Sequence, residues 1–251
     1  LRRRLEPAAF VAVCTWRGWD RLREQVPEFP VERLVLLRHG LPLGVDAVRA
    51  STEPLVLAVG RLEEKKGFEV WIDACARLRR EGVVFRGVLV GDGPRRDRLA
   101  ARRDAAGLRG VLELVGAATQ EQVMDWYARA RVVAVPSVPA ADGDQDGLPN
   151  VLLEAMAMRI PVVASAFSAI PEAVTDGVEG LLVPPGDPAA LAAAIRRLLE
   201  DPGEGRRMGE RGRARVCAAF DSLRNGAELA ARFGGTRHST AAGQGEQAGD
   251  A

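Results

Sequence analysis

The chain has 251 residues, of which 47% are hydrophobic and 27% are charged, an ordinary balance for a globular protein with one sizeable domain or two small ones. Its formal net charge of +1 gives no reason to expect nucleic acid or an anionic membrane surface as the main partner. No apolar run approaches the ~20 residues of a membrane-spanning helix, and the first residues lack the apolar core and cleavage site of a signal peptide.

The first part of the chain has the pattern of the end of a domain. Apolar patterning predicts a strand over residues 8–14, a helix over 17–26 and a further short strand over 34–37. This pattern is that of the last βα unit of a preceding domain, so we expect residues 1–37 to be its remnant, and the lack of an initial Met fits the cut end of a longer chain. Residues 38–53 contain Gly and Pro at short intervals, which predicts a hinge.

Residues 54–202 alternate short apolar runs with amphipathic helical patterns. Two helix starts are identifiable: Thr119 with Gln122 matches a capping box, and Asp187 precedes Pro188 as an N-cap precedes a first-turn proline. Buried strands separated by helices are typical of a parallel sheet covered on both faces, so the segment predicts a doubly wound α/β domain. The expected strands cover residues 55–59, 86–90, 111–115, 132–135, 161–164 and 180–183.

The end of the chain follows a different pattern. Residues 203–233 predict helices interrupted by glycines. Residues 234–251 are small, polar and Gly-rich, which predicts a disordered tail.

Cysteine and lysine are both rare in this chain. Cys14, Cys75 and Cys217 lie far apart without metal-type spacing, and we expect reduced, mostly buried cysteines in a cytosolic protein. Of the 35 basic Lys and Arg residues, only Lys65 and Lys66 are lysines. An ammonium is a compact charge on a flexible stem, whereas a guanidinium is planar, so the lysine pair indicates a chemical role. The alternative is chance pairing on a solvated loop.

Parallel sheets bind ligands beyond the carboxyl ends of their strands, which makes the loops after strands the candidate sites. The first is G-R-L-E-E-K-K-G, residues 60–67. Arg61 and Lys66 supply a bidentate fork and a point charge, which suit a diphosphate. Alternatively, Glu63 and Glu64 neutralise the cations of an ordinary surface loop. The spacing is not that of a P-loop.

Two further loops carry candidate residues. Gly91-Asp92-Gly93-Pro94 allows close backbone approach to a ligand but is equally typical of a tight turn, and no third glycine completes a dinucleotide fingerprint. Residues 136–157 form a polar loop leading into an apolar helix that contains Glu154, with Asp146 just before it. A helix start binds anions and a carboxylate accepts from vicinal hydroxyls.

Both acids have alternative interpretations. Asp146 is also explained as an acid favoured by the helix dipole, and Glu154 as a solvated helical residue, although its apolar neighbours make an unpaired charge costly. Asp142, Asp144 and Asp146 also suggest a D-x-D metal site, but no further ligands accompany them.

Together these motifs carry a family resemblance. The order G-R-L-x-x-x-K-G, G-D-G-P and D-G-L-P-N-V-L-L-E-A-M-A, followed by P-V-V-A, resembles glycosyltransferase family 4 of the GT-B fold over residues 54–202. That fold has two facing Rossmann-like domains, of which the C-terminal one holds the nucleotide-sugar. The resemblance therefore implies that this chain is the donor-binding half, with most of the N-terminal, acceptor-side half missing.

The resemblance also implies roles for individual residues. Arg61 and Lys66 would neutralise the donor diphosphate, and Glu154, the second acid of the family's E-x7-E motif, would bind the ribose hydroxyls. Asp146, the first acid, would contact the transferred sugar, which makes it catalytic together with Arg61 and Lys66. Backbone groups that would border the donor belong to Gly60, Gly91, Gly93, Val115, Gly116, Gly147, Leu148 and Pro149.

The chain departs from the family pattern at several positions. Asp146 replaces the usual Glu, Arg159 stands where Gly is usual, and Ala169 replaces a Gly near the expected phosphate. If residue 159 needs a positive φ, Arg there costs on the order of 1 kcal/mol or more. The family's N-terminal histidine has no good counterpart, because His39 lies in the expected hinge and His238 in the expected tail.

We therefore expect a retaining glycosyltransferase that transfers a hexose-type sugar from a nucleotide diphosphate sugar, in polysaccharide or glycolipid synthesis. It would use no metal and no cofactor, and its acceptor, a sugar or lipid-linked molecule, would need the missing domain or a partner chain. We expect it in the cytoplasm, at most peripheral to the inner membrane face. The alternatives are a sugar epimerase or hydrolase, and a degenerate nucleotide-binding or interaction module. The sequence does not specify the nucleotide.

Overall fold

The computed structural model describes residues 5–42 and 53–241 of the chain, with residues 235–241 described by their backbone alone. The chain divides into two compact units, one of residues 1–43 with 219–251 and a larger one of residues 44–218. Most of the predicted hinge lies outside the described residues.

The larger unit contains one parallel sheet of six strands in the order β5-β4-β3-β6-β7-β8. The predicted doubly wound α/β fold is confirmed, and each predicted strand is present within one residue of its expected bounds. The strands are β3 (Leu55–Val59), β4 (Arg86–Val90), β5 (Leu112–Gly116), β6 (Val132–Val135), β7 (Val162–Ser165) and β8 (Gly180–Val183).

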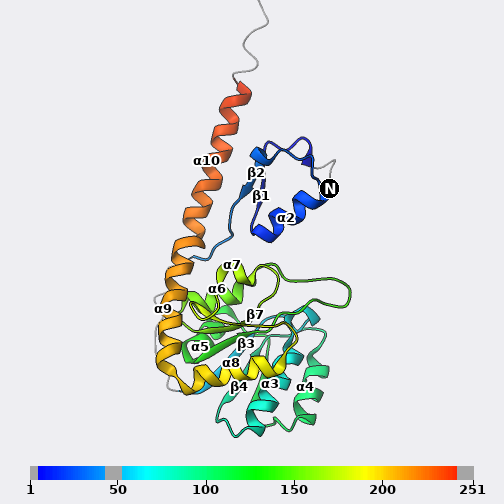
Figure 1. Ribbon diagram of the computed structural model, residues 1–251, viewed down its shortest axis with the longest axis vertical. Coiled ribbons are helices and arrows are strands. Elements are labelled where there is room, and N and C mark those ends of the chain that lie inside the picture. The colour runs from blue at the N-terminus through cyan, green and yellow to red at the C-terminus, as the bar shows by residue number, and fades with distance from the viewer. Residues whose placement is uncertain (1–4, 43–52, 242–251) are drawn as a thin grey trace, which may run out of the picture. The chain divides into compact units, whose positions relative to one another are not determined.

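Helices cover both faces of this sheet, with α3, α4 and α8 on one face and α5, α6 and α7 on the other (Figure 1). The predicted caps are confirmed. The Thr119 hydroxyl accepts from the Gln122 N–H, the Gln122 side chain accepts from the Thr119 N–H, and Asp187 caps α8. The helices are α3 (Phe68–Arg80), α4 (Arg96–Ala105), α5 (Gln120–Arg129), α6 (Asn150–Ala157), α7 (Ile170–Ala173), α8 (Pro188–Glu200) and α9 (Pro202–Ala219).

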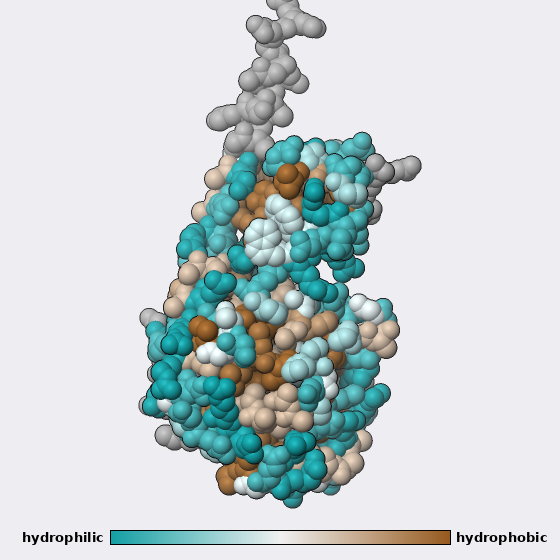
Figure 2. All heavy atoms as spheres, in the orientation of Figure 1, coloured by the Kyte–Doolittle hydropathy of each residue, from teal (hydrophilic) through white to brown (hydrophobic). Residues whose placement is uncertain are grey.

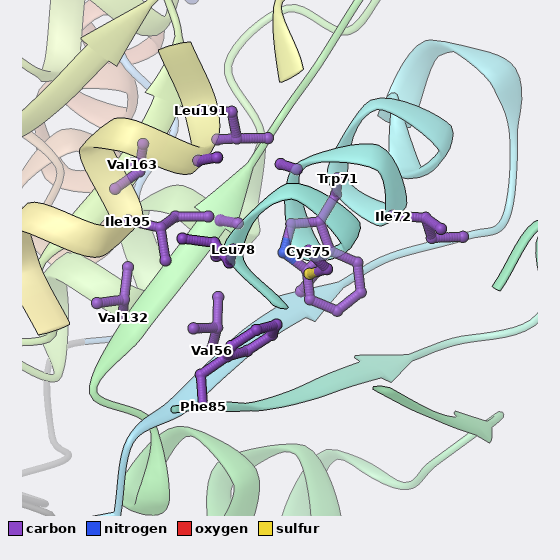
Figure 3. Packing of buried hydrophobic residues seen from close by; sticks show 14 of the residues in the cluster. Val56, Trp71, Ile72, Cys75, Leu78, Phe85, Val132, Val163, Leu191 and Ile195 are labelled. Carbon is purple, nitrogen blue, oxygen red and sulfur yellow. The ribbon is translucent and has the colours of Figure 1, made fainter. Parts of the chain in front are cut away.

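The main core lies between the sheet and the α3–α8 pair. Trp71 and Leu78 of α3 pack with Ile195 of α8 over Val56 and Val132 of the central strands (Figure 3). All five side chains are fully buried, and burying each large apolar one stabilises the fold by about 1.5–3 kcal/mol. Most of the visible surface of the larger unit is hydrophilic, with apolar residues gathered toward its middle (Figure 2).

Arg159, between α6 and β7, has φ 59°, the left-handed conformation that its place in the sequence suggested. This costs a residue with a Cβ about 1–2 kcal/mol. A Cβ at Gly209 of α9 would lie 1.9 Å from the Arg159 carbonyl oxygen. The sequence predicted that glycines interrupt this helix, but α9 is continuous through Gly209. The missing side chain of Gly209 instead lets α9 pack directly on this turn. Ala169, by contrast, has an ordinary φ of −93°.

The smaller unit contains the parallel pair β1 (Val11–Val13) and β2 (Leu34–Leu36), helix α2 (Trp16–Gln25), the short helix η1 (Val31–Arg33) and helix α10 (Ser222–Ala241). The predicted strand–helix–strand order is confirmed.

Helix α10 corrects the predicted boundary of the tail. It continues to Ala241, past the start at residue 234 that composition suggested, although the Gly, Ser and Thr of this stretch have low intrinsic helix propensity. The remaining residues of the predicted tail, 242–251, lie outside the described part of the chain.

Of the three cysteines only Cys75 is buried, and burial raises the pKa of its thiol. Cys14 is exposed and Cys217 half-buried, which corrects the expectation of mostly buried cysteines. Within the described residues, none of the helices combines the length and the apolar character that a bilayer span requires.

Candidate functional site

The sheet has a topological switch point between β3 and β6. From β3 the chain proceeds to β4 and β5 on one side, and from β6 to β7 and β8 on the other. In open parallel sheets, ligands bind outside the carboxyl ends of the strands at such a point. Here the loops of residues 60–67, after β3, and 136–149, after β6, flank it.

The glycine loops after β3, β4 and β5 lie side by side at this carboxyl edge. Gly60 N–H donates to Val90 O at 3.0 Å, and Gly91 N–H donates to Gly116 O at 2.8 Å. Gly91 has φ 141°, and a Cβ there would lie 1.9 Å from the Gly60 carbonyl oxygen. Gly91 is thus required for close approach to the first loop, beyond the ordinary tight turn that its sequence also allowed.

Gly93 and Val115 lie at the same edge. The Gly93 N–H donates a hydrogen bond to the adjacent Asp92 carboxylate at 2.8 Å, and Val115 is the penultimate residue of β5. The predicted donor-bordering residues of three loops are therefore neighbours in the structure.

The two lysines face acids from the loop after β6. Lys66 Nζ lies 2.7 Å from Asp146 Oδ2, and Lys65 Nζ lies 2.8 Å from Asp144 Oδ2 and 3.7 Å from Asp146 Oδ1. The hydrogen bond from the Lys65 ammonium to the Asp144 carboxylate raises the pKa of Lys65 and lowers that of Asp144. The lysine pair is thus neutralised across the switch point.

The loops are also joined through their backbones, because Val138 N–H donates to Lys65 O at 2.9 Å. The Lys66 and Asp146 side chains are only 20% and 13% exposed. Their contact is an ion pair without an aligned hydrogen bond to Asp146 Oδ2, so this oxygen keeps a hydrogen-bonding capacity that no described residue uses.

The alternative interpretation, in which Glu63 and Glu64 neutralise Arg61 and Lys66, holds for Arg61 and Glu63, whereas Lys66 pairs with Asp146. Glu63 lies 2.7 Å from Arg61 and 4.0 Å from Lys65, and Glu64 pairs with Arg95. The Arg61 side chain is 76% exposed. No contact among the described residues joins Arg61 to Lys66, so the structure does not bring these two predicted cations together.

The start of α6 lies at the end of the loop that carries Asp146. Gly147, Leu148 and Pro149 lead into the helix, and an added Cβ at Gly147 would meet no atom within 4 Å. Among the described residues, the N–H groups of Gly147 and Leu148 donate to no protein acceptor. A helix start with free N–H groups favours an anion.

Glu154 of α6 has a partner that sequence analysis missed. The Tyr127 hydroxyl, on α5, donates to Glu154 Oε2 at 2.9 Å. Tyr127 is 1% exposed, and burial together with the Glu154 charge raises its pKa. No contact of the described residues joins Glu154 to Lys66 or Asp146.

A metal site at the three aspartates finds no support in the side-chain arrangement. Within residues 5–42 and 53–241, no group of three or more His, Cys, Asp or Glu side chains is placed to hold a metal ion. Asp144 and Asp146 each face a lysine instead.

Comparison with curated proteins finds glycosyltransferases. The amylovoran biosynthesis glycosyltransferase AmsK of Erwinia amylovora is 38% identical over 173 residues, covering 67% of this chain and 42% of that protein. The alpha-D-kanosaminyltransferase of Streptomyces kanamyceticus is 32% identical over 241 residues, covering 91% of this chain and 61% of that protein. The chain thus spans less than two thirds of each relative.

Solved structures share the fold. Anabaena Alr3699/HepE, crystallised in complex with UDP, superposes with a TM-score of 0.79 at 22% identity, covering 91% of this chain and 64% of that one. Sucrose-phosphate synthase from Thermosynechococcus elongatus gives a TM-score of 0.76 at 33% identity, covering 95% and 60%. The sequence model of one family, described as Glycosyl transferases group 1, matches residues 46–215. The chain therefore belongs to the group 1 glycosyl transferases, and its larger unit has their Rossmann-like GT-B architecture.

Proposed function

We propose that the larger unit binds the nucleotide diphosphate sugar of a retaining, metal-independent glycosyltransferase at the switch-point edge. The observation that carries the proposal is the placement of the chain's two lysines, 20–21% exposed, across the switch point from a helix start with free N–H groups. Cations and N–H groups that converge at such an edge suit a diphosphate.

Each predicted residue has a role in this proposal. In this proposal the Lys66 ammonium binds the diphosphate. The exposed Arg61 side chain, which pairs with Glu63 in the unliganded chain, turns to bind it as well. Asp146 contacts the transferred sugar, and Glu154 accepts from the ribose hydroxyls. The glycine edge of Gly60, Gly91, Gly93 and Gly116, with Val115, borders the nucleotide.

Transfer forms a bond between the anomeric carbon and an acceptor hydroxyl oxygen, whose proton passes to the departing phosphate. It breaks the bond between the anomeric carbon and the distal phosphate oxygen, on which negative charge develops. Lys66 and the N–H groups of Gly147 and Leu148 stabilise that charge, since preorganised donors act where charge develops. No cofactor is needed, because the nucleotide-sugar is itself the second substrate.

The acceptor is a sugar or a lipid-linked molecule in polysaccharide or glycolipid synthesis. The relative AmsK, which acts in amylovoran biosynthesis, supports this class. The acceptor would bind to an N-terminal domain of which residues 1–37 form the end, supplied by a longer chain or by a partner, with residues 38–53 as the hinge. The proposed location is the cytoplasm, at the inner membrane face when the acceptor is lipid-linked.

Calorimetric titration of the chain with UDP, GDP and ADP tests the proposal. We expect one of them to bind and Lys66→Ala to weaken that binding. Arg109→Ala is the matched control. It removes one positive charge just before the amino end of β5, whereas the proposed site lies at the carboxyl ends of the strands. No binding by any nucleotide, or equal losses in the two variants, contradicts the proposal.

A further inference from the structure

Tyr127 and Glu154 form a contact that the proposed roles leave unexplained. The two residues come from α5 and α6, on the same face of the sheet. The Tyr127 hydroxyl has one proton, and the Glu154 Oε2 atom at 2.9 Å is a nearer acceptor than the Val151 carbonyl oxygen at 3.5 Å. Because a carboxylate is also the stronger acceptor, the proton goes to Glu154.

We propose that Tyr127 is a positioning residue that fixes the Glu154 carboxylate for recognition of a vicinal diol. This inference rests on the proposed function, in which Glu154 binds the ribose. A tyrosine bond to Oε2 fixes the plane of the carboxyl group and leaves Oε1, and the second lone pair of Oε2, for two neighbouring hydroxyls.

The surroundings support this role. Tyr127 is 1% exposed, so its ring is held by packing and its hydroxyl does not exchange its partner for bulk water. Its raised pKa keeps the proton on the hydroxyl at neutral pH, where the group acts as a donor. Glu154 is half-buried, and a freely rotating carboxylate there would lose rotamer entropy on binding a diol.

Nucleotide selectivity tests the inference. The probes are the nucleoside diphosphate that binds and its 2′,3′-dideoxy counterpart. Tyr127→Phe keeps the ring and removes the hydroxyl. We expect it to weaken binding of the ribonucleotide about 5- to 10-fold, the equivalent of one hydrogen bond, and to change binding of the dideoxynucleotide less than about twofold.

Glu154→Gln supplies the matched control. We expect it to weaken ribonucleotide binding by at least as much, and Tyr127→Phe to add no further loss in the Glu154→Gln background, because the two residues act through one contact. Parallel losses for both nucleotides in Tyr127→Phe, or additive losses in the double variant, would show a merely structural role and overturn the inference.

A second measurement needs no variant, because Tyr127 is the only tyrosine of the chain. Tyrosine labelled with ¹³C at the hydroxyl-bearing ring carbon gives one resonance. We expect the ribonucleotide to shift it, since diol hydroxyls draw on the same carboxylate, and the dideoxynucleotide to leave it in place. An unmoved resonance at ribonucleotide saturation overturns the inference while leaving the proposed donor site intact. Failure of every nucleotide to bind overturns both.

Discussion

Asp146 should oppose the binding of a bare nucleoside diphosphate, although in the proposed function it contacts the transferred sugar. Its carboxylate lies 2.7 Å from the Lys66 ammonium and 3.7 Å from that of Lys65. A diphosphate that reaches Lys66 must share the ammonium with this carboxylate and is repelled by it. Asp146→Asn keeps the shape of the side chain and removes the charge, so it should raise the affinity for the nucleoside diphosphate.

The magnitude follows from the geometry. Two unit charges ~6 Å apart interact by about 3 kcal/mol at an effective dielectric constant of ~20. Solvent screening at a partly exposed edge reduces this to about 1 kcal/mol, roughly a fivefold gain in affinity. Lys66→Ala removes a charge-assisted contact of about 1.5–3 kcal/mol and should weaken binding roughly 10- to 150-fold.

The assay is calorimetry with the bound nucleotide at fixed salt, on Asp146→Asn, Lys66→Ala and the charge control Arg109→Ala. With the nucleotide-sugar and a complete acceptor domain, Asp146→Asn should slow transfer while nucleotide binding tightens. If Asp146→Asn weakens or does not change binding of the bare nucleotide, the shared-ammonium reasoning is refuted.

Three further predictions concern stability. The hydrogen bond from Lys65 lowers the pKa of Asp144 from its ordinary 3.8, so the ion pair stabilises the fold above that pH and this contribution is lost as pH falls through the lower folded value. Denaturant midpoints of Asp144→Asn and the unmodified chain should therefore differ at pH 7 and draw together as pH falls below 3.8. Because Arg159 has φ 59°, Arg159→Gly should be about 1 kcal/mol more stable in urea unfolding than Arg159→Ala, and equal stabilities would show that the conformation is not strained. Gly91→Ala places a Cβ 1.9 Å from a backbone oxygen, whereas Gly147→Ala meets nothing, so thermal unfolding should show a loss of about 1–3 kcal/mol or more for the first variant only.

Local signals in the sequence predicted the scaffold well. The Thr119–Gln122 capping box and the Asp187 cap involve residues two to three positions apart, so their geometry follows from short-range pattern. The strands were predictable because buried parallel strands are continuous apolar runs. The composition of the tail was less informative, since α10 extends through its first residues.

The partners within the site were not predictable, because they depend on long-range packing. Lys65 and Asp144 are 79 residues apart in sequence, and only the order of the strands brings their loops together. The apolar neighbours of Glu154 indicated that its charge needs a partner, but nothing local identified Tyr127. Arg61 was predicted to share a diphosphate with Lys66 from its place in the loop and from the family resemblance, whereas its side chain pairs with Glu63, two residues away.

Hydrogen–deuterium exchange with and without saturating nucleoside diphosphate tests the placement of the donor site most directly. We predict slowed exchange in residues 60–67 and at the N–H groups of Gly147 and Leu148, which donate to no described protein acceptor in the unliganded chain, with little change at the opposite edge of the sheet. Unchanged exchange in both segments, or slowed exchange at the amino ends of the strands, would contradict a diphosphate site at the switch point.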